Sequence, residues 1–331
     1  MQVSDVHWSE DIARQVVWLS GKLPFGDVAE IMKELGQVSI SKSSVWRLCQ
    51  NWGEKFRVEE EKRLERDSLP ICEDLPNGDK RMGISMDGFM VHIAEEGWKE
   101  VKAGSVFEIE KERTLNKETL APEEIGRARE VSHVAHLGGP ELFGKHLWGE
   151  ALRRDWQSSS ETQIVGDAAR WIWRLSEKYF YKSHMLVDWF HSVEHLANAG
   201  EVYYGSDTVA RENWLKEQKT ALFREDTKQV IRTLKEKVKK KRGASRKKLL
   251  QELTFFENNQ RKMRYKSLRD QGWLVGSGII ESAAKQYKTR FAGPGMRWKR
   301  SSMERMLPIR ATVMSHDFNV KWHKLYYSPT N

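Results

Sequence analysis

The sequence has only two cysteines, Cys49 and Cys72, among 331 residues. This low count excludes a disulfide framework and a cysteine-rich zinc module, and it is typical of proteins in a reducing cytoplasm. No run of residues approaches the roughly 18 consecutive apolar residues that a membrane-spanning helix requires. The first residues lack a basic start followed by an apolar core, so we expect no signal peptide. We therefore predict a cytoplasmic protein with no membrane partner.

The composition is that of a globular chain with a heavily charged surface. Apolar residues make up 39% and charged residues 31% of the sequence, which excludes a membrane protein. The length predicts two or three domains. Lysine and arginine number 56 against 47 aspartates and glutamates, giving a net charge of +9. This balance weakly favours a polyanionic partner, since many basic proteins bind no nucleic acid.

Three short helices are predicted between residues 9 and 53, the third with Ser41 or Ser43 as its N-cap. Three such helices joined by a glycine-containing turn are typical of a helix-turn-helix unit, so residues 1–55 are predicted to form an all-α DNA-binding domain. On this interpretation the third helix enters the major groove and presents Lys42, Ser44, Arg47 and Gln50. The alternative is a plain helical cap whose polar residues face solvent.

Residues 56–80 are charged and then rich in turn-forming residues, which predicts a linker. Beyond it, RMGISMDG, FMVHIAEE and WKEVKAGSVFEIE predict three antiparallel strands. Residues 108–160 are predicted to be helical. Two short strands follow, which end at Asp167 and at Asp188 and are separated by a helix.

This order of elements is that of an α/β fold, a ribonuclease-H-like mixed sheet with helices on both faces. The corresponding catalytic domain is predicted to span residues 81–331. Residues 190–272 are almost entirely helical in pattern and very polar, which predicts a large all-helical insertion. Within it, residues 237–248 carry eight lysines or arginines and no acid. This run is either a solvated connection or, as we favour, an edge that contacts phosphates through Lys239, Lys240, Lys241 and Arg242.

Three carboxylates are the candidate catalytic residues. Asp87 and Asp167 each end a buried strand, and ligands bind at strand ends in α/β sheets. Two carboxylates about one strand spacing apart, ~5 Å, repel each other unless a cation lies between them. Hard oxygen ligands select Mg²⁺ or Mn²⁺, and a third carboxylate completes a site for two ions. Glu281, one turn inside a helix that follows the flexible Gly-Ser-Gly of residues 276–278, is the predicted third ligand.

Several blocks of the chain resemble bacterial insertion-sequence transposases of the DDE type, close to the Kra group. In chain order these blocks are SMDGFMVHI with GWKEVKAGSVF, GDAARWIW, VDWFHSVEHL and GSGIIESAAKQYKTRFAGPGMRWKRSSMERMLPIRA. The resemblance implies that Asp87, Asp167 and Glu281 are a catalytic triad for DNA cleavage and strand transfer. It also implies a bacterial, nucleoid-associated protein whose N-terminal helices bind the terminal inverted repeats, and which forms at least a homodimer on double-stranded DNA.

The segment Asp188 to His195 has three interpretations. Asp188-x-x-His191 resembles a signature of Mutator-like transposases, which implies a supporting role for both residues at the site. The same segment also fits H-x-x-E-H, in which His191 and His195 hold zinc and Glu194 is the base of a peptidase. The third interpretation is that the two histidines pack and hydrogen-bond in the core.

Further DNA contacts are predicted near the C-terminus, where Trp298 lies among cations. An aromatic side chain in such surroundings is suited to stacking on a flipped base, although anchoring of the last helices is an equal alternative. The candidates are Arg290, Arg297, Trp298, Lys299 and Arg300.

Two classes of function remain open. The first is an active transposase that cleaves the element's ends and transfers the 3′-hydroxyl strand to target DNA. The second is a catalytically silent DNA-binding protein descended from a transposase. A plain ribonuclease-H-like nuclease is a weaker third, because such an enzyme needs no N-terminal DNA-binding domain.

Overall fold

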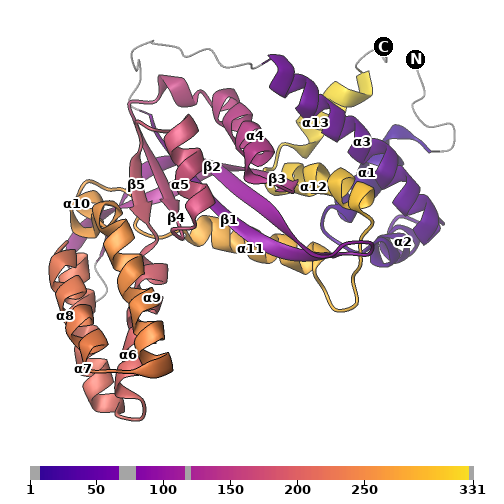
Figure 1. Cartoon of the computed structure of the whole chain (residues 1–331). Coiled ribbons are helices and arrows are strands. Elements are labelled where there is room, and N and C mark those ends of the chain that lie inside the picture. The colour runs from indigo at the N-terminus through magenta and orange to yellow at the C-terminus, as the bar shows by residue number, and fades with distance from the viewer. Residues whose placement is uncertain (1–7, 67–79, 116–120, 328–331) are drawn as a thin grey trace.

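The computed structural model describes residues 8–66, 80–115 and 121–327. Its centre is one mixed sheet with the strand order β3-β2-β1-β4-β5 (Figure 1). Pairing is antiparallel between β1 and β2 and between β2 and β3, and parallel between β1 and β4 and between β4 and β5. The predicted α/β class with a mixed sheet is confirmed. The strands are β1 (Arg81–Ile93), β2 (Gly97–Leu115), β3 (Pro122–Leu137), β4 (Glu161–Gly166) and β5 (His184–Val187).

Two predictions about the antiparallel part of the sheet are wrong. The segments around Asp87 and Val91 are one continuous strand, β1, instead of two. The prediction of helix over residues 108–160 fails for 108–115, which belong to β2, and for 122–137, which form β3. That segment is rich in Glu, Arg and Ala, which favour helix, but Arg129 forms an ion pair with Glu112 of the neighbouring strand at 2.9 Å. Cross-strand pairing therefore overrides the local preference.

Helices cover both faces of the sheet. Because side chains alternate along a strand, Ile84 and Met86 of β1 pack with α4 (Pro140–Arg153) and α5 (Arg170–Tyr179). Phe89 points to the other face and stacks on Tyr287 of α11 (Gly278–Phe291), with ring centroids 5.3 Å apart. Asp87 and Phe89 are two residues apart on β1, so their side chains point to the same face of the sheet. Asp87 therefore lies on the face that α11 covers.

A helical bundle extends from the β5 side of the sheet (Figure 1). It follows β5 directly in the chain and returns to the sheet at α11, and most of residues 190–272 lie in its helices. Its buried residues, such as Leu222, Leu234 and Phe256, come from three different helices. The helices are α6 (Trp189–Tyr204), α7 (Thr208–Phe223), α8 (Thr227–Lys239), α9 (Gly243–Asn259) and the short α10 (Tyr265–Asp270).

The N-terminal helices are α1 (Glu10–Ser20), α2 (Phe25–Glu34) and α3 (Lys42–Arg66). As predicted, Ser41 caps the third helix, because its Oγ accepts a hydrogen bond from the backbone N–H of Ser44 at 3.1 Å. This helix spans 25 residues, so the predicted start of the linker at residue 56 falls inside it. Residues 67–79 of the predicted linker, Cys72 among them, lie outside the described residues.

The N-terminal helices share their core with the C-terminal helices α12 (Arg300–Met314) and α13 (Phe318–Tyr327). Trp52 of α3 stacks on Trp322 of α13 with centroids 3.7 Å apart. Two buried arginines also satisfy carbonyls at the end of α1: Arg290 donates to Ser20 O at 2.7 Å and Arg310 to Gly21 O at 3.0 Å. Because Arg290 belongs to α11, the N-terminal helices are fastened to the helix that carries Glu281.

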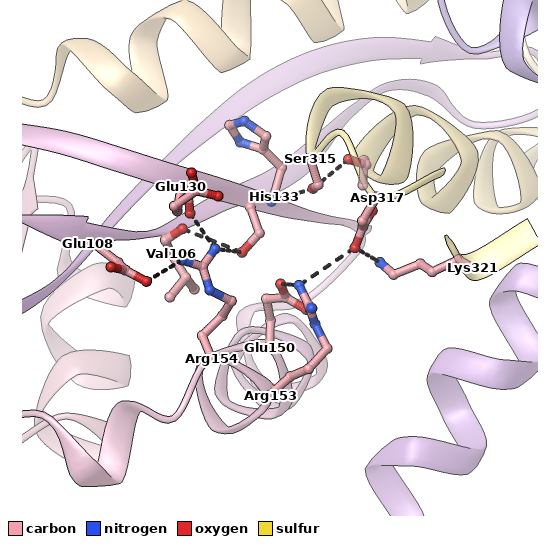
Figure 2. A network of polar contacts seen from close by, with 12 residues as sticks. Val106, Glu108, Glu130, His133, Glu150, Arg153, Arg154, Ser315, Asp317 and Lys321 are labelled. Carbon is pink, nitrogen blue, oxygen red and sulfur yellow. Dashed lines mark hydrogen bonds and ion pairs between the residues drawn. The ribbon is translucent and has the colours of Figure 1, made fainter. Parts of the chain in front are cut away.

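A polar network joins α4 to the junction between α12 and α13 (Figure 2). The buried carboxylate of Glu150 pairs with Arg153, and Arg153 also approaches Asp317 at 3.6 Å. Lys321 of α13 is the last member of this network, and its Nζ lies 3.0 Å from Oδ2 of Asp317. The network therefore ties the C-terminal helices to the sheet layer, and it lies apart from the candidate site.

Candidate functional site

A cavity of about 290 Å³ opens where the sheet, α6 and the start of α11 meet. All three candidate catalytic carboxylates line it, together with both residues predicted to support them. The lining residues are Met86, Asp87, Asp167, Asp188, Phe190, His191, Glu194, Ser277, Ile280 and Glu281.

Strand pairing sets the positions of Asp87 and Asp167. The parallel register of β1 and β4 ends at the pair Met86 and Gly166, and each aspartate is the next residue of its chain segment. Adjacent strands lie about 4.8 Å apart, so the two carboxylates are neighbours. The prediction that Asp87 ends a strand is wrong, because β1 continues beyond it in antiparallel pairing with β2.

Local hydrogen bonds hold one oxygen of each aspartate. Asp87 Oδ1 accepts from the backbone N–H of Gly88 at 2.6 Å, and Asp167 Oδ1 accepts from that of Ala169 at 3.0 Å. Between Asp167 and Ala169 the chain turns through Ala168, whose φ of 69° is unusual for a residue with a Cβ. Among the described residues, the second oxygen of each aspartate has no hydrogen-bond partner, so it is available to a ligand.

Glu281 reaches the cavity from the first turn of α11, and its Oε1 accepts a hydrogen bond of 3.4 Å from Ser277 Oγ. Asp188 is buried and caps α6 by accepting from the backbone N–H of His191 at 2.6 Å. The second oxygen of Asp188 accepts from the backbone N–H of Ser277. Asp188 therefore positions the start of the helix that carries Glu281.

The cavity concentrates negative charge. Burial raises the pKa of Asp87, and the nearby charges of Asp167 and Glu281 raise it further, against the lowering effects of the Gly88 hydrogen bond and Lys288. Such mutual repulsion is relieved by a divalent cation, and hard carboxylate oxygens fit Mg²⁺ or Mn²⁺. In donor chemistry and charge the residues fit such an ion. Among the described residues, however, no three His, Cys, Asp or Glu side chains are grouped closely enough to hold a metal ion.

The two histidines of the H-x-x-E-H segment hydrogen-bond to each other. Their Nε2 atoms are 3.3 Å apart, and His195 Nδ1 contacts Glu252 of α9. His195 also stacks on Phe255, with ring centroids 3.6 Å apart. This arrangement supports the interpretation that the histidines pack and hydrogen-bond, although His191 still lines the cavity.

Among the predicted DNA-contacting residues of α3, Lys42 and Arg47 are exposed and Ser44 is half-buried. The prediction for Gln50 is wrong, because its side chain is 7% exposed. Gln50 follows Leu48 and Cys49 on the side of α3 that packs against the rest of the molecule. Of the basic run, Lys239, Lys240 and Arg242 are exposed and Lys241 is half-buried.

Two predicted contacts near the C-terminus are also wrong. Arg290 is 2% exposed and donates a hydrogen bond to Ser20 O at the end of α1. Trp298 is 8% exposed and its Nε1 donates to Phe291 O at 2.9 Å, so it is an anchor and cannot stack on a base. Arg300 is paired with Glu96 at 2.6 Å. Arg297 and Lys299 are exposed, and they remain the candidates for DNA contact near the C-terminus.

Sequence reasoning missed several residues at the site. Phe190 lines the cavity with 66% of its surface exposed, which is unusual for a large apolar side chain. Lys285 and Lys288 are exposed and share a face of α11 with Glu281, by the i, i+4, i+7 spacing. That spacing was readable in the sequence, whereas the exposure of Phe190 follows only from the fold.

Comparison with known protein families finds a match to part of the chain. The sequence model described as Uncharacterised protein family (UPF0236) matches residues 148–324, more than half of the chain. The match includes Asp167, Asp188, His191 and Glu281, while Asp87 and the N-terminal helices lie outside it. No curated protein matches the chain significantly. Within the described residues, no helix has the length and apolar character needed to cross a membrane.

Proposed function

The chain belongs to the uncharacterised protein family UPF0236, and from this premise we propose that it is a DDE transposase. Its activity is cleavage of double-stranded DNA at the ends of an insertion sequence, followed by transfer of the 3′-hydroxyl strand to target DNA. The observation that carries the proposal is the meeting of Asp87, Asp167 and Glu281 in one cavity. They come from three separate elements, and packing of the fold does not require acids there.

The proposed fold is ribonuclease-H-like. Three antiparallel strands followed by two parallel ones, with the acids at β1, after β4 and on a later helix, support it. The bundle between β5 and α11 is then an insertion between the second and third acids. This placement leaves the cavity between the sheet and the bundle, where a DNA strand can enter.

In this proposal Asp87, Asp167 and Glu281 hold two Mg²⁺ or Mn²⁺ ions. The chemistry that such ions supply is Lewis-acid polarisation of the scissile phosphodiester. The protein's own part is to fix the carboxylates: the Gly88 and Ala169 N–H groups orient the two aspartates, and Asp188 holds the start of α11. Exposed cations on α3 and at the tip of the bundle would bind phosphates of the terminal repeats and of target DNA. Because two ends must be paired, we expect at least a homodimer on DNA.

A catalytically silent DNA-binding protein is the second candidate. The observation that favours it is that no three potential ligands among the described residues are grouped closely enough for a metal ion. On this alternative the basic surfaces still bind DNA, and Glu281 is an ordinary helix residue.

One cleavage assay separates the two candidates. The protein is incubated with DNA carrying the inverted repeats that flank its own gene, in Mg²⁺, Mn²⁺ or EDTA. The proposal predicts metal-dependent nicking at the repeat ends, lost in Glu281→Gln and retained in Glu304→Gln. Glu304 is a matched control, because it pairs with Arg300 on α12 and does not line the cavity. Binding without cleavage in either metal would leave the silent protein as the better description.

A further inference from the structure

A chain of hydrogen bonds runs from the helical bundle into the acidic cavity. Glu252 on α9 contacts His195 Nδ1 on α6, and His195 Nε2 lies 3.3 Å from Nε2 of His191. His191 lines the cavity. The side chain of Glu252 is 14% exposed and that of His195 23%, so solvent competes little for these bonds.

When both imidazoles are neutral, the chemistry of these groups decides which ring nitrogens carry protons. A carboxylate is only an acceptor, so His195 must carry its proton on Nδ1 to bond to Glu252. The Nε2 of a neutral His195 is then an acceptor, and the facing Nε2 of His191 must be the donor. A neutral His191 protonated on Nε2 keeps a lone pair on Nδ1. That atom lies 3.6 Å from Oε2 of Glu194, another residue that lines the cavity.

Phe255 fixes the geometry of this chain. Its ring stacks on His195 at a centroid distance of 3.6 Å and meets the edge of His191 at 5.7 Å. Neither imidazole can then rotate without losing an aromatic contact. Phe255 and Glu252 are both on α9, so one bundle helix holds both rings.

We propose that Glu252 and His195 are positioning residues, and that they hold His191 with Nδ1 ready to accept a proton from the attacking nucleophile. The proposal rests on the proposed function, since the nucleophile is the water or 3′-hydroxyl of DNA cleavage and strand transfer. As the nucleophile's oxygen bonds to phosphorus, its O–H bond breaks and the proton moves to His191 Nδ1. The bond from phosphorus to the leaving 3′ oxygen breaks, and that oxygen takes a proton from water. His191 then passes its proton through Glu194, which is 68% exposed, to solvent.

On this view the bundle is part of the catalytic site. Glu252 does not line the cavity, so its removal would affect catalysis indirectly. Without it, His195 could change its tautomer, and His191 could then change its own. A role in packing alone would instead lower stability and leave the tautomers of a folded protein unchanged. The two roles are therefore separable by measurement.

The first test needs no DNA. Nitrogen-15 NMR of the full-length chain labelled in histidine reports which ring nitrogens carry protons, and His191→Gln and His195→Gln assign the signals. The expected result is a proton on Nδ1 of His195 and on Nε2 of His191. A proton on His191 Nδ1 would overturn the proposal. So would one equivalent of Zn²⁺ binding through both Nε2 atoms, which would make the pair a metal site.

The second test is the rate of cleavage of the repeat-end DNA at saturating protein. We expect His191→Ala to lower the rate about 10²–10⁴-fold, the usual size of a general-base effect, with DNA affinity unchanged. Glu252→Ala should lower it at least roughly 10-fold, and Glu252→Gln should restore most of the rate because its amide oxygen still accepts from His195. Glu257→Gln is the matched control, since Glu257 lies on the same helix and pairs with Lys235 at 2.7 Å.

The outcomes distinguish this proposal from the proposed function. Wild-type cleavage with an undiminished rate in His191→Ala would overturn only the role of His191. Wild-type binding with no cleavage in Mg²⁺ or Mn²⁺ would overturn both. A thermal melt of each variant shows that it is folded, and His191→Gln serves as the second variant if His191→Ala is not.

Discussion

The buried carboxylate of Asp188 accepts a hydrogen bond from the backbone N–H of Ser277, 89 residues further along the chain. Its other oxygen caps α6 through the N–H of His191. The backbone N–H of Asp188 donates to Gly166 O at 2.8 Å, beside Asp167. One residue therefore connects the sheet, the bundle and the helix that carries Glu281.

Asp188→Asn should impair both stability and activity. The amide keeps one acceptor oxygen, so its NH₂ group faces the N–H of either Ser277 or His191, and a buried unsatisfied donor costs about 1–3 kcal/mol. Urea denaturation should show this loss, and cleavage of repeat-end DNA should fall because the start of α11 or of α6 is released. The control is Asp207→Asn, which alters the exposed cap of α7 and should leave cleavage unchanged. Equal effects of the two variants on cleavage would contradict the positioning role.

Asp87→Asn should stabilise the metal-free protein at neutral pH. Burial and the charges of Asp167 and Glu281 raise the pKa of Asp87, so ionising it opposes folding once the pH exceeds its normal value. Thermal melts in EDTA should show a gain of up to about 3 °C. Asp270→Asn, at an exposed residue paired with Lys266, should show none. A lower melting temperature for Asp87→Asn would argue against repulsion within the cavity.

Arg290 and Arg297 should separate stability from DNA binding. Arg290→Met removes the donor to Ser20 O, which should cost about 1–3 kcal/mol in urea denaturation. Arg297→Gln changes an exposed side chain, so we expect normal stability with weaker binding to a duplex probe. A loss of DNA affinity in well-folded Arg290→Met that exceeds the loss in Arg297→Gln would contradict the structural role of Arg290.

The sequence located the acids better than it located the DNA-contacting residues. Asp167 and Asp188 were predictable because each follows a short apolar strand, a local pattern. Gln50 and Arg290 are polar residues on helices, and the local sequence gives no sign that tertiary packing buries them. For β3, helix-favouring composition was overridden by pairing with β2, a non-local interaction that no local window contains.

The network of Glu150, Arg153 and Asp317 predicts a loss of stability in acid (Figure 2). Burial opposes ionisation of Glu150, but its hydrogen bonds to Arg153 and the charge of Lys321 prevail and lower its pKa from 4.5 to about 2. A lowered carboxyl pKa stabilises the fold above the unfolded value, and this contribution is lost as the pH falls from 4.5 toward 2.

Glu150→Gln should therefore flatten the dependence of unfolding free energy on pH between about 4.5 and 2, by up to about 3 kcal/mol. Urea denaturation at several pH values measures this slope. Glu257→Gln, at a half-exposed ion pair, should leave the slope close to that of the wild type. An unchanged slope in Glu150→Gln would show that other carboxylates account for the acid sensitivity.

Lys288 lies close enough to the acidic cavity for its charge to lower the pKa of Asp87. Because it is exposed and shares a face of α11 with Glu281, a phosphate beside the scissile bond can reach it. Each phosphate contact releases counterions, so Lys288→Gln should weaken binding of repeat-end DNA and reduce the slope of log affinity against log salt by about 1. Lys266→Gln, at an exposed lysine engaged with Asp270 on α10, should leave that slope unchanged. Fluorescence anisotropy at several salt concentrations measures both variants, and a common slope would mean that the DNA backbone does not follow α11.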